Sequence, residues 1–134
     1  MPTVFEKLNL KEQQKILILN APDSFEPELK KLRDVQVYRR IDDMKEILFA
    51  LAFVTRRVEL DRASKALAVK AVPDPVLWFA YPKGTSKKFT CDFNRDDGWE
   101  QLRQSGFDSV RMVAIDQDWS ALRFRRIEFI KRAR

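Results

Sequence analysis

The sequence predicts a single α/β domain of three layers over residues 1–134, with a mostly parallel sheet of Rossmann-like topology that ends in an antiparallel hairpin. Short apolar runs typical of buried strands alternate with stretches whose apolar residues recur at helical spacing, as in α/β folds. The last two strand patterns, 110–115 and 122–127, are separated only by the link 116–120. That link suits a hairpin and is too short for a parallel crossover. At 134 residues, 45% of them hydrophobic, the chain has the size of one domain.

The first part of the chain alternates between helix and strand signals. Thr3 begins a Thr-x-x-Glu capping box, which predicts a short helix at this end. The apolar run 15–20 predicts the first strand. A helix capped at residue 23 or 24 follows, because acidic residues and a proline occupy its first turn. Alternation over 35–38 predicts a half-buried strand.

The middle of the chain carries the two longest strand signals. Residues 46–54 and 76–81 are continuous apolar runs that predict strands buried on both faces. Between them we expect a helix capped by Thr55 and stopped by two prolines after residue 72. Its expected apolar stripe is Val58, Leu60, Ala63, Leu67 and Ala71. A last helix is expected after Asp97, with Gly106 as its C-terminal stop.

The composition excludes several kinds of chemistry. The chain has a net charge of +6, a single cysteine and no histidine. The lack of histidine excludes a Ser-His-Asp triad, a Cys-His pair and a His-ligated metal, and one thiol cannot build a zinc site in one chain. The lone cysteine fits a reducing cytoplasm, and no segment has the pattern of a membrane helix or a signal peptide. We therefore expect a cytoplasmic protein without a metal or a membrane partner.

The residues after the first predicted strand argue against dinucleotide binding. Asn20, Ala21, Pro22 and Asp23 replace the Gly-x-Gly-x-x-Gly pattern, in which glycine lets the backbone approach a pyrophosphate. NAD and FAD are therefore not expected, and an S-adenosylmethionine site is disfavoured for the same reason. We expect no cofactor.

Polar segments follow the predicted strands at the edge where open α/β sheets bind ligands. The segment 83–88 is short, basic and rich in hydroxyl groups. Gly84 would let backbone N–H groups approach an anion, and the link 116–120 would supply the opposing wall. A solvated basic turn is the alternative interpretation of these residues taken alone, and it is the one that we favour for the segment. The ligand-binding residues predicted on this basis are Lys83, Gly84, Thr85, Ser86, Asp116, Trp119 and Ser120.

Three further residue groups have a functional and a structural interpretation. Asp116 and Asp118 could act as paired acid/base carboxylates, but Asp-Gln-Asp-Trp-Ser is typical of a turn, which we favour. Arg123 and Arg125 could present a basic face to nucleic acid or an acidic partner, but we favour an edge strand protected by charge. Cys91 is interpreted as a small apolar filler, because no histidine base accompanies it. The basic excess at this end comprises Arg123, Arg125, Arg126, Lys131, Arg132 and Arg134.

The second half of the chain, from Leu77 to Phe124, resembles a family of small bacterial α/β proteins of unknown function. The family pattern is an aromatic strand ending in Pro-Lys and a later Asp-x-x-Trp-Ser motif. The matching residues are Pro82, Lys83, Ser86, Asp116, Trp119, Ser120, Leu122 and Arg123. The resemblance implies an α/β fold and a bacterial cytoplasmic setting, and it implies no activity.

The sequence thus favours a non-enzymatic or regulatory module that binds a small anionic metabolite at the carboxyl ends of the strands. The alternative is an interaction protein that uses its basic C-terminal strand for nucleic acid or an acidic partner, and nucleic acid is not favoured. An enzyme that uses Asp116 and Asp118, with Lys83 as an electrophile, ranks third.

Overall fold

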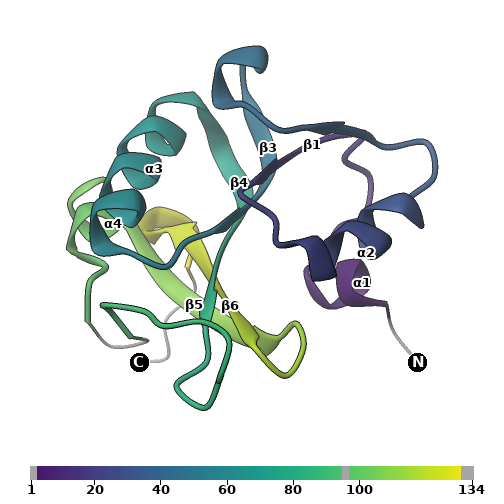
Figure 1. The fold of residues 1–134 in the computed structure, drawn as a ribbon. Helices are drawn as coiled ribbons and strands as arrows, with labels where there is room; N and C mark the ends of the chain where they lie inside the picture. Colours follow the sequence, from purple (N-terminus) through teal and green to yellow (C-terminus); the bar gives the residue numbers. More distant parts are fainter. Residues whose placement is uncertain (1–2, 95–96, 131–134) are drawn as a thin grey trace.

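The computed structural model describes residues 3–94 and 97–130. These residues form a six-stranded sheet in the order β2-β1-β3-β4-β6-β5, with helices on both faces (Figure 1). The strands are β1 (Lys15–Leu19), β2 (Gln36–Tyr38), β3 (Ile47–Phe53), β4 (Ala71–Pro82), β5 (Phe107–Ala114) and β6 (Trp119–Arg126). The α-helices are α1 (Val4–Lys7), α2 (Glu26–Lys30), α3 (Arg57–Lys70) and α4 (Glu100–Gln104), and the 3-10 helices are η1 (Asp23–Phe25), η2 (Ile41–Asp43) and η3 (Ile127–Phe129).

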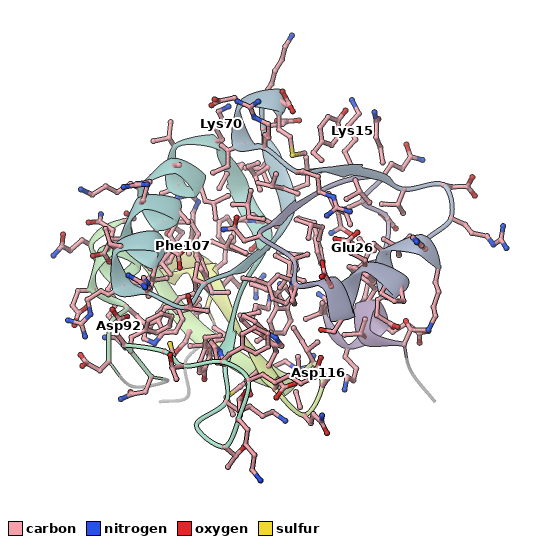
Figure 2. All side chains as sticks on the ribbon, in the orientation of Figure 1. Lys15, Glu26, Lys70, Asp92, Phe107 and Asp116 are labelled. Carbon is pink, nitrogen blue, oxygen red and sulfur yellow. The ribbon has the colours of Figure 1, made fainter. Side chains whose placement is uncertain are left out.

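Strand directions confirm the predicted fold class. β1 is parallel to β2 and β3, and β3 is parallel to β4. β6 is antiparallel to both β4 and β5, so it forms a hairpin with β5 and leaves β5 pointing the same way as β4. The sheet is therefore mostly parallel, with one inverted strand. Asp92 and Asp116 lie at the edge where the parallel strands end, and Lys15 and Lys70 at the opposite edge (Figure 2).

The side chains of β4 alternate between two cores, one on each face of the sheet. Leu77, Phe79 and Tyr81 belong to the core under α3 and α4. Val76, Trp78 and Ala80 belong to the core under α1 and α2. Because both faces are covered, the strand reads as a continuous apolar run. The buried indole Nε1–H of Trp78 donates to the carbonyl oxygen of Leu8 at 2.7 Å, which ties the N-terminal helix to the sheet.

Two helices begin later than the sequence predicts. The carboxylate of Glu59 accepts hydrogen bonds from the backbone N–H groups of Thr55 and Arg56, so α3 begins at Arg57 and Thr55 is not its N-cap. The buried residues of α3 are Leu60, Ser64 and Leu67, whereas Val58 is exposed and Ala71 already belongs to β4. The N-cap of α4 is Trp99 instead of Asp97.

The interpretation of residues 122–127 as an edge strand is wrong. β6 lies between β4 and β5, so its backbone is paired on both sides and Phe124 is buried. The edge strand on this side of the sheet is β5, whose side chains are mostly exposed. Lys131, Arg132 and Arg134 lie outside the described residues. No helix in residues 3–94 and 97–130 is long and apolar enough to cross a membrane.

An ion pair joins the start of β4 to the end of β6. Arg125 donates from Nε and Nη2 to the two carboxylate oxygens of Asp74 at 2.9 and 2.8 Å. These hydrogen bonds hold the pKa of the Asp74 carboxyl below its usual value. Both side chains are about one-third exposed, so solvent screens the pair.

The Asp74–Arg125 pair predicts a pH-dependent stability. A carboxyl with a lowered folded-state pKa stabilises the fold above its unfolded pKa and loses this effect as the pH falls through the folded pKa. We expect Asp74→Asn to lower the free energy of unfolding by less than about 1 kcal/mol at pH 7. Urea unfolding at stepped pH should show this cost shrinking below about pH 4. The control is Asp42→Asn, at an exposed residue. If Asp74→Asn lowers the free energy of unfolding by the same amount at every pH, or by no more than the control does, the Asp74–Arg125 pair does not stabilise the fold in this way.

Candidate functional site

The carboxyl ends of β1, β3 and β4 lie at one edge of the sheet. In an open α/β sheet the ligand crevice lies outside these ends, where the strand order reverses. Here the order reverses between β1 and β3, because β2 lies on the other side of β1. Asn20, after β1, and Thr55, after β3, therefore lie at the place where this rule puts a ligand crevice. We call this place the β1–β3 crevice.

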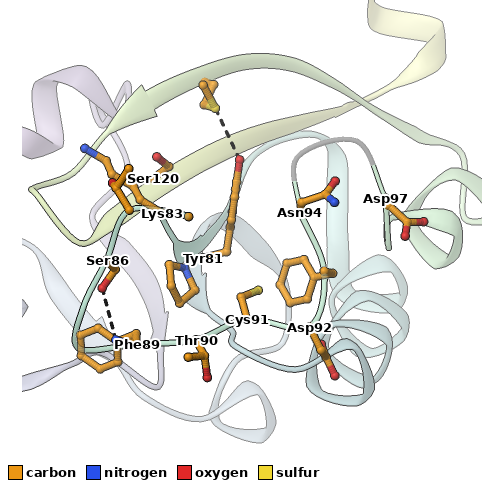
Figure 3. Close-up of a pocket in the computed structure, with 15 residues that line it drawn as sticks. Tyr81, Lys83, Ser86, Phe89, Thr90, Cys91, Asp92, Asn94, Asp97 and Ser120 are labelled. Carbon is orange, nitrogen blue, oxygen red and sulfur yellow. Dashed lines mark hydrogen bonds between the residues drawn. The ribbon is translucent and has the colours of Figure 1, made fainter.

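A pocket of about 1030 Å³ opens at the end of β4. We call it the β4 pocket. Its walls are the end of the strand, the loop that follows it and the β5–β6 hairpin (Figure 3). In the close-up, Cys91 lies on the loop between Thr90 and Asp92, and Asp97 lies at the right of the view. The lining residues are Tyr81, Pro82, Lys83, Gly84, Thr85, Ser86, Phe89, Thr90, Cys91, Asp92, Phe93, Asn94, Asp97, Met112 and Ser120.

A second pocket of about 490 Å³ lies next to it, beside the end of β3. We call it the β3 pocket. Thr55, Arg56 and Lys88 line this pocket only. The segment 89–92 lines both pockets. One short stretch of chain is therefore the wall between two neighbouring cavities.

Asp92 fastens that wall to the first turn of α3. Its Oδ1 accepts a hydrogen bond from the backbone N–H of Arg57 at 2.6 Å, and its own N–H donates to the carbonyl of Thr55 at 3.3 Å. A carboxylate at the start of a 14-residue helix satisfies a free N–H and complements the helix dipole. Arg57 also pairs with Asp97 at 3.0 Å, which fixes the far end of the loop.

Ser86 fastens the near end of the loop to the hairpin. Its hydroxyl donates to Oδ1 of Asp118 at 2.9 Å and accepts from the backbone N–H of Phe89 at 3.2 Å (Figure 3). The N–H of Lys83 donates to the carbonyl of Asp118 at 2.8 Å. With the loop held in this way, the ring of Phe89 packs on Trp119 at 4.9 Å.

The turn after β1 is tight although it contains no glycine. Asn20 has a φ of 57°, in the left-handed region that asparagine tolerates better than most side chains. Phe25 follows in η1 and packs on Phe53 at 5.0 Å. Arg39, after β2, donates to both carboxylate oxygens of Glu26 at 2.8 Å, and these hydrogen bonds lower the pKa of Glu26. The turn after β1 and the segment after β2 are therefore held in place without a glycine-rich loop.

The structure brings together most, but not all, of the ligand-binding residues predicted from the sequence. Lys83, Gly84, Thr85, Ser86 and Ser120 line the β4 pocket. Trp119 is buried and does not line that pocket, and Asp116 lines a different pocket of about 430 Å³ beside α1. Their roles as ligand-binding residues stay predictions.

The turn interpretation of Asp116 is confirmed. Its Oδ1 accepts from the backbone N–H groups of Asp118 and Trp119 at 2.8 and 2.9 Å, which is the hydrogen bonding of an Asx turn. Asp118 is engaged with Ser86. Among the described residues, no group of three His, Cys, Asp or Glu side chains is placed to hold a metal ion.

Sequence reasoning missed the residues of the shared wall. Phe89, Thr90 and Asp92 follow the basic segment without any local motif. Asp92 caps a helix that begins 35 residues earlier in the chain, so no sequence spacing could reveal the contact. Arg56 follows the predicted strand 46–54, and that position already placed it at the expected ligand edge of the sheet.

Comparison with known proteins identifies the fold. No family model and no curated protein matches this chain. The structure is similar to magnesium protoporphyrin IX methyltransferase from Synechocystis PCC 6803 with bound SAH, at 10% identity and a TM-score of 0.57, over 92% of this chain and 78% of that chain. It is also similar to a Sulfolobus solfataricus protein assigned to the type 11 methyltransferases, at 6% identity and a TM-score of 0.51, over 84% of each chain. The chain has a Rossmann-like fold of the methyltransferase type.

These neighbours overturn the function that we expected from the sequence. Both of these similar structures are described as methyltransferases, so the expectation of a module for an anionic metabolite is wrong. The alternative function was an interaction protein that uses its basic C-terminal strand for nucleic acid or an acidic partner. It is also replaced, since that strand, β6, is an internal strand of the sheet. The third hypothesis, catalysis by Asp116 and Asp118, fails because the structure engages both in the hairpin turn.

Gly98 holds the loop that walls the β4 pocket, and its replacement should be costly. It has a φ of 109°, and a Cβ there would lie 2.7 Å from the Cβ of Phe93. We expect Gly98→Ala to lower the free energy of unfolding by more than about 1 kcal/mol in urea titrations. Gly84→Ala is the matched control, because a Cβ there meets nothing within 4 Å and the change should stay within about 0.5 kcal/mol. Equal effects of the two substitutions would refute this account of the loop.

Cys91 should react slowly with thiol reagents. Burial, with a smaller contribution from the charge of Asp92, raises the pKa of its thiol, while a hydrogen bond from the Phe93 backbone acts in the opposite direction. The reactive thiolate is therefore scarce at neutral pH. We expect iodoacetamide at pH 8 to alkylate the folded protein more slowly than glutathione, and the urea-unfolded protein as fast as glutathione. A folded protein that reacts faster than glutathione would mean an activated cysteine.

Proposed function

We propose that this protein is an S-adenosylmethionine-dependent methyltransferase. The observation that carries the proposal is the fold, which covers 92% of this chain and 78% of a methyltransferase with bound SAH. The two adjoining pockets at the carboxyl edge of the sheet support it, because methyl transfer needs a donor and an acceptor side by side. The proposal replaces the expected non-enzymatic module.

The donor fits the β1–β3 crevice and the β3 pocket beside it. Asn20 makes the sharp turn that a glycine-rich loop would otherwise make. Arg56 and Lys88 provide positive charge for the carboxylate of the donor's amino-acid end, and Asp92 provides negative charge for its sulfonium. Glu26, kept ionised by Arg39, is a candidate acceptor for ribose hydroxyl groups at the start of α2.

The acceptor fits the β4 pocket. Tyr81, Pro82, Phe93 and Met112 form the apolar part of its lining, and the segment 89–92 borders both this pocket and the β3 pocket, so the acceptor and the donor would lie next to each other. S-adenosylmethionine supplies an activated methyl group on a positively charged sulfur. The contribution of this chain is to orient the acceptor against that group and to exclude water. The resemblance to a family of unknown function and the cytoplasmic location stay predictions beside this proposal.

Isothermal titration with S-adenosylmethionine and SAH tests the proposal. We expect both to bind at one site per chain. Thr90→Trp places a large ring in the wall shared by both pockets and should weaken SAH binding at least about tenfold, or about 1.4 kcal/mol. Lys87→Trp is the matched control, because Lys87 is an exposed neighbour that lines neither pocket.

Retained affinity in Lys87→Trp together with loss in Thr90→Trp would support donor binding at this edge. If neither compound gives a binding isotherm with the folded wild-type protein, the methyltransferase proposal fails. Binding that both substitutions leave unchanged would place the donor elsewhere and contradict the site.

A further inference from the structure

We propose that the segment 83–89 is a lid whose Phe89 end covers the donor site, and that Trp119 beneath Phe89 holds its indole N–H ready for the methyl donor. The inference rests on the proposed function. It assigns to Phe89 the role of a cover that must move and to Trp119 the role of a ligand contact. We call this segment the 83–89 lid.

A row of aromatic rings crosses the carboxyl edge of the sheet and ends at the lid. Phe25 packs on Phe53 at 5.0 Å, and Phe53 packs edge-on against Trp119 at 5.1 Å. Trp119 in turn contacts Phe89 at 4.9 Å. Phe25, Phe53 and Trp119 are 2%, 2% and 3% exposed, whereas Phe89 is only half-buried. Phe89 therefore covers the row from outside, next to the β3 pocket that it also lines.

The indole Nε1–H of Trp119 is the observation that points to a ligand. It is buried and has no hydrogen-bond partner among the described residues. Buried N–H groups in native proteins are nearly always paired, and an unpaired one calls for an explanation such as a functional role. The other indoles follow the rule, because Trp78 donates to the carbonyl of Leu8 and Trp99 to that of Asn94.

The contacts that close the lid are few and can be exchanged for water. The Ser86 hydroxyl donates to Asp118 and accepts from the N–H of Phe89, and at the other end of the segment the N–H of Lys83 donates to the carbonyl of Asp118. Lys87 and Lys88 are exposed. Hydrogen bonds near the surface cost little to replace by water, so the lid can open without unfolding the sheet below.

A lid that must open lowers the apparent affinity of the ligand beneath it. The apparent dissociation constant equals the intrinsic one divided by the fraction of open molecules. Variants that favour the open lid should therefore bind the donor more tightly, which is the opposite of what a merely structural contact predicts. In a variant whose lid is already open, loss of the Trp119 N–H should then weaken binding of the donor.

The experiment compares SAH affinity and tryptophan exposure in the folded wild-type protein and four variants. Ser86→Ala removes the hydrogen bonds of the Ser86 hydroxyl and keeps the Phe89 ring. We expect this variant to bind SAH about three- to tenfold more tightly in titration calorimetry. Phe89→Ala should change the affinity in the same direction. Adding Trp119→Phe to Ser86→Ala should reverse the gain. Lys87→Ala, in the same segment, is the control and should match the wild type.

Acrylamide quenching of tryptophan fluorescence reports how far the lid is open when no ligand is bound. All three tryptophans are at most 3% exposed, so quenching should be weak in the wild type and stronger in Ser86→Ala and Phe89→Ala. Weaker SAH binding in both variants, or unchanged quenching, overturns the lid. If SAH binds no variant while quenching rises as expected, the methyltransferase proposal and the role of Trp119 fail, and the lid alone is supported.

Discussion

The pairing of β4 with a parallel neighbour on one side and an antiparallel one on the other determines the arrangement of the site. The register with β3 brings Phe53 beside Ala80, so the two strands end together. The register with β6 brings Pro82 opposite Trp119, so the turn of the hairpin lies where β4 ends. Because these pairings share one edge, the loop after β4 is placed between the start of α3 and the hairpin.

Much of the fold could be predicted from the sequence because its signals are local. The apolar runs of β1, β3 and β4 are bounded by polar residues, and the link 116–120 is too short for anything but a hairpin. The basic segment 83–86 was placed at the carboxyl edge for the same reason, and the structure puts it on the β4 pocket. Helix starts were less accurate, since Glu59 caps α3 from within its own first turn and Asp97 pairs with the distant Arg57 instead of capping α4.

The rest of the site could not be predicted because it depends on contacts between distant residues. Asp92 reaches the start of α3, and Ser86 reaches Asp118, 32 residues further along the chain. The absence of glycine after β1 argued against a methyl-donor site. The structure shows Asn20 in a left-handed conformation that makes a tight turn without glycine, and the sequence pattern does not reveal this.

The most direct measurement for the whole account is an amide spectrum by nuclear magnetic resonance, recorded as SAH is added. The account predicts that the resonances of Asn20, Thr55 and residues 88–92 shift, together with the indole N–H of Trp119. Shifts confined to the amino edge of the sheet, around Lys15 and Lys70, or a spectrum unchanged at saturating SAH, would contradict it.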